Sequence, residues 1–90
     1  MRVVRTPEGQ ALAVPSNRER EVLRELCTGA PYKVIAWRLG MSMSAVKGHL
    51  ASLTGELGMN RTQLAIWAAN NPEVFEDDTA VPIARVELVA

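Results

Sequence analysis

The stretch Tyr32–Leu57, YKVIAWRLGMSMSAVKGHLASLTGEL, contains two apolar patterns of helical spacing on either side of Gly40–Ser42. The first comprises Ile35, Ala36 and Leu39, and the second comprises Val46, Leu50, Leu53 and Leu57. Each set lies on one face of a helix, which predicts helices over 32–39 and 43–57. Gly40 suits the left-handed residue that ends a helix, and the Ser42 hydroxyl can accept a hydrogen bond from the next helix. Two helices joined by so short a turn predict a helix-turn-helix.

Two further helices are predicted on either side of this unit. Ser16 and Glu19 form a capping-box pattern before a helix whose inner face is Val22, Leu23 and Leu26, and for Cys27 beside them we expect a small buried hydrophobe. Asn60 and Gln63 form the same pattern before a fourth helix over about 61–70, which is apolar on more than one side. Because so small a domain cannot bury every side of a helix, we expect a homodimer interface comprising Leu64, Ala65, Trp67 and Ala68.

The ends of the chain have β-prone sequences. Residues 2–5 and 10–14 flank a Pro–Glu–Gly turn and predict a β-hairpin. Residues 81–89 predict an edge strand that could pair with the hairpin, within one chain or across two, and residues 73–78 a solvated acidic linker. We therefore divide the chain into an arm over 1–15, a helix-turn-helix domain over 16–70 and a linker with a strand over 71–90. The predicted fold class is mainly α, with four helices and short β segments.

Composition and charge restrict the possible functions. The chain has 90 residues, 48% of them hydrophobic, with ten basic and ten acidic side chains. Residues 16–70 have a net charge of +3 and residues 71–90 a net charge of −4. One cysteine excludes an internal disulfide, and we expect no catalytic site, metal or cofactor. The sequence contains no transmembrane run and no signal peptide, so we expect a cytoplasmic protein without membrane contact.

The outer faces of the two central helices are unusual. On the first, Val34 and Trp37 point away from the predicted core, so we expect the hairpin, the C-terminal strand or a partner chain to cover them. On the second, the outer stripe consists of Ser44, Lys47, Gly48, Ala51 and Gly55. A stripe this small permits close approach of another surface, either a DNA groove or a second helix.

These residues resemble the LuxR/GerE (NarL-like) DNA-binding domain of bacterial transcription regulators over about residues 15–70. The resemblance depends on REREVL at 18–23, Gly29, K-x-IA-x-x-LG-x-S at 33–42, VK-x-HL at 46–50 and LG-x-NRT at 57–62. It implies four packed helices, the third of which enters the major groove of double-stranded DNA, while the fourth often forms a dimer interface. Region four of a sigma factor is a second fold of the same class, but the 47–49 and 58–62 motifs argue against it.

The resemblance also implies the DNA-binding residues. Lys47 would contact the major groove or an adjacent phosphate, Lys33 a phosphate, and Ser42 would cap the recognition helix. His49 matches the family's motif but lies beside the core stripe, so a structural role is equally open. The expected DNA-binding surface is Lys33, Ser42, Ser44, Ala45, Lys47, Gly48, His49 and Ala51.

Three departures from the family leave the function open. Ala45 stands where the family has Thr, Glu56 where it has Lys, and Pro31, Tyr32 and Val34 replace the usual polar start of the second helix. Near the expected DNA face only four cations are available: Lys33, Arg38, Lys47 and Arg61. One hypothesis is a stand-alone, dimeric DNA-binding transcriptional regulator that inserts its third helix into the major groove. The alternative is a degenerate helix-turn-helix that binds a protein, such as RNA polymerase or another regulator, with weak or no DNA binding.

Overall fold

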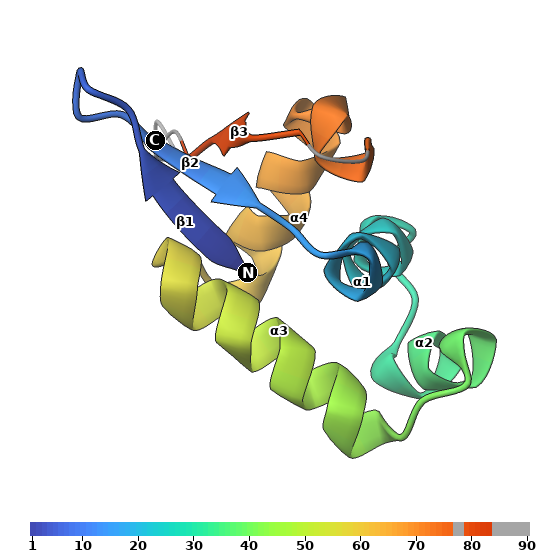
Figure 1. Cartoon of the computed structure of the whole chain (residues 1–90). Helices are drawn as coiled ribbons and strands as arrows, with labels where there is room; N and C mark the ends of the chain where they lie inside the picture. Colours follow the sequence, from blue (N-terminus) through green and yellow to red (C-terminus); the bar gives the residue numbers. More distant parts are fainter. Residues whose placement is uncertain (77–78, 84–90) are drawn as a thin grey trace.

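A computed structural model of the protein describes residues 1–76 and 79–83 (Figure 1). The described elements are β1 (Arg2–Arg5), β2 (Ala11–Val14), α1 (Asn17–Cys27), α2 (Tyr32–Leu39), α3 (Met43–Leu57), α4 (Arg61–Asn70), the 3-10 helix η1 (Pro72–Phe75) and β3 (Val81–Pro82). The predicted fold class, four helices with short flanking strands, is confirmed. The helix-turn-helix comprises α2 and α3.

Local hydrogen bonds set the helix boundaries. In the capping box of α1, Ser16 Oγ accepts from Glu19 N at 3.2 Å and Glu19 Oε1 accepts from Ser16 N at 2.8 Å. Asn60 and Gln63 repeat the arrangement at α4, and Ser42 Oγ accepts from Ala45 N at 3.0 Å to start α3. Gly40, with φ of 64°, ends α2 in the left-handed conformation. Each such cap contributes about 1 kcal/mol, so the sequence defines these ends locally.

The core forms where the inner faces of the helices meet. The predicted inner residues of α1 and α3 are buried, as are Ile35 and Ala36 of α2, whereas Leu39 is half-buried. Leu64, Trp67 and Ala68 of α4 are also buried, and Trp67 Nε1 donates to the Pro82 carbonyl at 3.0 Å. The packing that was expected between two chains is therefore provided by one chain, and these three side chains are not available to a partner. Of the four residues expected at a dimer interface, only Ala65 reaches the surface.

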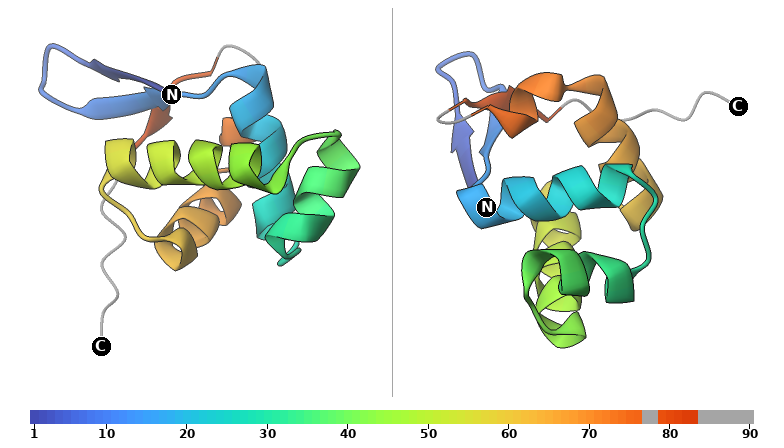
Figure 2. Two further views of the ribbon diagram at one scale, coloured as in Figure 1. Left: turned by 90° about the horizontal axis from the view of Figure 1, so that it is seen from below. Right: turned by 90° about the vertical axis from the view of Figure 1, so that its right-hand side faces the viewer.

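The strands form an antiparallel sheet in the order β1-β2-β3. The predicted hairpin is confirmed, and β3 joins it within the same chain, with Ala13 opposite Val81 and Leu12 opposite Pro82. Ala13 and Val81 are fully buried and fix the sheet to the core. The described part of the predicted strand over 81–89 is short, and its residues 84–89 lie outside the described residues. The hairpin projects from the end of the molecule opposite to α2 (Figure 2).

Two expectations about smaller segments were wrong. The start of the predicted solvated linker is the packed helix η1, whose Val74 is fully buried and whose Phe75 ring lies 5.3 Å from the guanidinium carbon of Arg24. Cys27 is exposed rather than buried, because it occupies the last residue of α1, where its Sγ lies 3.7 Å from the Ala65 carbonyl oxygen. The positions of η1 and of Cys27 both depend on how α1 and α4 pack against each other.

The amino group of Met1 joins three elements. Its nitrogen lies 2.5 Å from Glu19 Oε2 at the start of α1 and 3.2 Å from Glu56 Oε2 at the end of α3. Burial alone would lower the pKa of this ammonium group, but its hydrogen bonds and ion pairs with the two carboxylates raise it. Burial would likewise raise the pKa of Glu19, but hydrogen bonds from Met1 and Ser16 lower it. Glu56 thus has a structural role at the end of α3.

This cluster predicts a pH dependence of stability. Because the pKa of Glu19 falls below its ordinary 4.5 on folding, its contribution is present above that pH and is lost as the pH falls through the folded-state pKa. The raised pKa of Met1 means that its contribution to stability is present below its ordinary 8.0 and is lost as the pH rises through the folded-state value.

The variant Glu19→Gln tests this pH dependence, because it removes the charge of Glu19 but preserves the capping box. We expect urea unfolding to show the largest destabilisation of this variant between about pH 5 and pH 8. Glu8→Gln in the exposed hairpin turn is the control, and an equal loss at about pH 3 would contradict the prediction.

The apolar pair on α2 is not covered by the described part of the sheet. Trp37 is 82% exposed, whereas Val34 is half-buried and packs against the core, so the expectation that it points away from the core was wrong. The expectation of cover by the hairpin was wrong, because α2 lies at the opposite end of the molecule from the strands (Figures 1 and 2). Of the other expected covers, a partner chain remains as a hypothesis, and residues 84–89 of the C-terminal strand lie outside the described residues.

The two tryptophans should therefore respond differently to a quencher. Trp37 is open to solvent, whereas Trp67 is 1% exposed. In acrylamide titrations we expect two populations in the wild type and loss of the red-shifted, readily quenched one in Trp37→Phe. The remaining emission should be several-fold less quenchable because a buried indole is shielded. Equal quenching of both proteins would mean that Trp37 is covered in solution.

Candidate nucleic-acid interface

The outer face of α3 is exposed and almost without side chains. Opposite the buried Val46, Leu50, Leu53 and Leu57 lie the exposed Ser44, Lys47, Gly48, Ala51 and Gly55. A Cβ atom at either glycine would meet no heavy atom within 4 Å, so packing inside the chain does not require glycine there. Each interior glycine costs a helix about 1 kcal/mol relative to alanine. No contact within residues 1–76 and 79–83 therefore explains the small surface, which is suited to close approach by another molecule.

The structure brings the expected DNA-binding residues to this region. Lys33, in the first turn of α2, is exposed, as are Ser42, Ser44, Lys47, Gly48 and Ala51. Ala45 and His49 are half-buried, at the border between the stripe and the core. The Ser42 hydroxyl is occupied by the Ala45 amide, so its side chain acts as a helix cap.

A concavity of about 230 Å³ lies beside the stripe, between α3 and the beginnings of α2 and α4. It is lined by Tyr32, Lys47, Leu50, Ala51, Thr54, Met59, Asn60, Arg61 and Leu64. The guanidinium carbon of Arg61 lies 4.5 Å from the centroid of the Tyr32 ring. The sequence analysis counted Arg61 among four available cations but did not select it or Tyr32 as site residues. The signal for Arg61 was its place in the LG-x-NRT motif, and the signal for Tyr32 was an aromatic residue at a position that is ordinarily polar in the family.

One of the four cations counted near the expected DNA face is not available to DNA. Arg38 Nη1 lies 2.9 Å from Glu25 Oε2, so its charge is compensated by α1. Lys33, Lys47 and Arg61 remain at this surface, and two of them occupy the first turns of α2 and α4. Neither helix has an acidic residue in its first turn, whereas α1 has Glu19 there. Because the positive end of the helix dipole disfavours a cation, this distribution opposes helix stability and favours an external anion.

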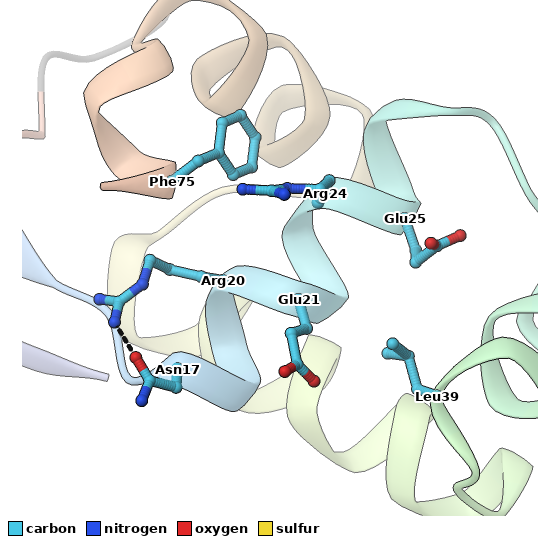
Figure 3. Close-up of a pocket in the computed structure, with 7 residues that line it drawn as sticks. All are labelled: Asn17, Arg20, Glu21, Arg24, Glu25, Leu39 and Phe75. Carbon is cyan, nitrogen blue, oxygen red and sulfur yellow. Dashed lines mark hydrogen bonds between the residues drawn. The ribbon is translucent and has the colours of Figure 1, made fainter. Parts of the chain in front are cut away.

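A larger concavity, of about 360 Å³, lies on the α1 side of the molecule (Figure 3). Its charged residues serve the fold. Glu21 and Glu25 pair with Arg18 and Arg38 at 2.9 Å, and Arg20 donates to the Pro15 carbonyl at 2.7 Å and to Asn17. Figure 3 shows Phe75 beside Arg24 at one wall and Leu39 at the other. Because acidic side chains lie among the basic ones, this concavity does not favour a small anion or a nucleic-acid backbone.

Other kinds of site have no support among the described residues. In residues 1–76 and 79–83 no cluster of three or more His, Cys, Asp or Glu side chains could hold a metal ion. Over the same part of the chain, no helix is both long and apolar enough to cross a membrane.

Comparisons with known proteins identify two relatives and one protein family. Two relatives are 40% identical over 60 residues: the probable csgAB operon transcriptional regulatory protein of Salmonella typhimurium and the CsgBAC operon transcriptional regulatory protein of Escherichia coli. The matched region covers 66% of this chain but only 28% of each relative. No solved structure matches the chain significantly. The family profile described as "Bacterial regulatory proteins, luxR family" (GerE) matches residues 13–68, from the end of β2 through most of α4. The chain therefore belongs to the luxR family of bacterial regulatory proteins.

Proposed function

We propose that this chain is the DNA-binding part of a transcriptional regulator and inserts α3 into the major groove. The observation that carries the proposal is the exposed stripe around Lys47, whose Gly48 and Gly55 no internal contact requires. The major groove is about 12 Å wide and admits one helix, so a bare helix face can approach base edges closely. Lys47 is the long side chain on this stripe and can donate to a base edge or a phosphate. The printed names of the two relatives, both operon regulators, support the same class of function.

Backbone contacts would come from the residues beside the stripe. Lys33 and Arg61 are exposed in the first turns of α2 and α4. With Lys47 they offer three cations per subunit, and each neutralised phosphate contributes about 0.9 to the slope of log affinity against log salt. One subunit therefore has a slope of at most about 2.7, which is small for a specific DNA-binding protein. A dimer doubles this number.

Glu56 was, with Ala45 and the low charge, an argument for the alternative, a degenerate helix-turn-helix with weak or no DNA binding. Its carboxylate contacts the Met1 ammonium group at 3.2 Å and accepts from the Ser52 hydroxyl at 3.0 Å. This acidic residue is thus used to attach β1 to α3, and an opposite charge lies next to it. The alternative retains one specific observation, the exposed Trp37, which fits a protein partner such as RNA polymerase or another regulator.

For the dimer we propose the outer face of α4 rather than its buried residues. Thr62 and Ala69 are exposed and Ala65 and Ile66 are half-buried, at i, i+3, i+4 and i+7 spacing. This places small and apolar side chains in one stripe that a second copy could cover around a twofold axis. Two copies of α3 would then read half-sites about one helical turn of DNA apart.

Substitutions of the two lysines should have different effects. We expect Lys47→Ala to remove most sequence preference, at about 1–3 kcal/mol for its preferred site, because a groove contact is lost. Lys33→Ala should weaken binding to all DNA about equally and lower the salt slope by about 0.9. The measurement is selection from a random DNA library followed by salt-titrated binding, with Arg5→Ala on the hairpin as control. Unchanged site selectivity in Lys47→Ala would show that α3 does not read the groove as assigned.

The dimer is tested by placing a charge in its proposed interface. Ala69→Glu adds a carboxylate at an exposed position, so the monomer should fold normally while two copies repel each other. Analytical ultracentrifugation on a two-half-site duplex should show two chains per DNA for the wild type and one for the variant. Gln10→Glu in the hairpin is the matched control. Equal stoichiometry for all three proteins would place the interface elsewhere.

A further inference from the structure

We propose that Tyr32 is a positioning residue that holds Arg61 so that Arg61 and Lys47 together bind one phosphate of the DNA backbone. The phosphate would occupy the concavity between α3 and the beginnings of α2 and α4. This inference rests on the proposed DNA-binding function and assigns a specific contact within it. It adds Tyr32 to the DNA-binding surface and gives a specific role to Arg61, which the sequence analysis counted only among the available cations.

The first observation is the stacking of Arg61 on Tyr32. The guanidinium carbon lies 4.5 Å from the ring centroid, within the range of a cation–π interaction. Arg61 is exposed, and within residues 1–76 and 79–83 it has no carboxylate partner. The stacked ring restricts a side chain that would otherwise sample many rotamers. Its N–H donors therefore stay at the concavity and remain free for an anion.

The second observation is the character of the concavity. Two of its lining residues, Lys47 and Arg61, are cationic and none is acidic, in contrast to the paired charges of the larger concavity on α1. Thr54 and Asn60 add polar groups, and the rest of the lining is apolar, with Leu50, Ala51, Met59 and Leu64. A backbone phosphate with its deoxyribose has the matching character, since the anion requires cationic donors and the sugar an apolar wall.

The third observation is the position of this concavity relative to the recognition helix. Ala51 and Lys47 belong both to the outer stripe of α3 and to the lining, so the two surfaces are continuous. Figure 2 (left) shows the beginnings of α2 and α4 on the same side of α3. A duplex with α3 in its major groove would bring one backbone strand along this side. The contact is therefore independent of base sequence.

The experiment compares the wild type with Arg61→Gln, Tyr32→Leu, Tyr32→Phe and the double variant Tyr32→Leu/Arg61→Gln. The probe is a random-sequence duplex of about 20 bp, because a phosphate contact needs no specific site. We expect Arg61→Gln to lower the salt slope by about 0.9. Tyr32→Leu should weaken binding several-fold, Tyr32→Phe should match the wild type because it keeps the ring, and Tyr32→Leu should have no further effect once Arg61 is replaced. A merely structural role of Tyr32 would give the same loss in both backgrounds.

Circular dichroism establishes that each variant is folded. If Tyr32→Leu does not fold, Arg61→Lys provides the test, because it keeps the charge but loses the planar stacking group. That variant should bind several-fold more weakly with an unchanged salt slope. A wild type that binds DNA together with an Arg61→Gln variant of unchanged slope would overturn this inference alone. A wild type that binds no DNA would overturn the proposed function and this inference with it.

Discussion

The burial of one face of α3 against α1, α2 and α4 is the interaction on which the rest of the structure depends. Val46 and Leu53 are completely buried in this contact, and Leu50 is nearly so. At about 25 cal/mol per Å² of apolar area, these residues are a main source of stability in a chain of this size. Because the buried face fixes the rotation of α3 about its axis, it also fixes which residues face solvent. The bare stripe around Lys47 is the direct geometrical consequence.

The flanking segments complete this core. The sheet attaches to it through Ala13 and Val81, and Pro82 provides the acceptor for the indole of Trp67. Directly before β1, the Met1 ammonium group forms ion pairs with Glu19 of α1 and Glu56 of α3. The sheet and the Met1 cluster are thus part of one packed unit with α1 to α4. This explains how a helix that looks too apolar for a small domain is buried without a second chain.

The surface that we assign to DNA combines features that stabilise neither the helices nor the core. Glycines in the interior of α3 and cations in the first turns of α2 and α4 each disfavour the local structure. Features that oppose local stability in an otherwise consistent sequence are expected at functional sites. Here they lie on one continuous surface together with the stacked pair of Tyr32 and Arg61. In contrast, Glu56 and Arg38 form ion pairs within the fold, with Met1 and Glu25 respectively.

The sequence by itself determined the helices and their ends. Capping boxes at Ser16 and Asn60 and the left-handed Gly40 act within four residues, and apolar periodicity identified the inner face of each helix. Only the tertiary structure decided what those faces contact: that the buried Trp67 donates to Pro82 of β3, that Trp37 is exposed, and that Arg61 lies over a ring 29 positions earlier in the chain. The physical reason is range. Backbone hydrogen bonds and helical periodicity are local properties of the sequence, whereas the partner of an apolar face or a long cationic side chain depends on how helices distant in sequence cross.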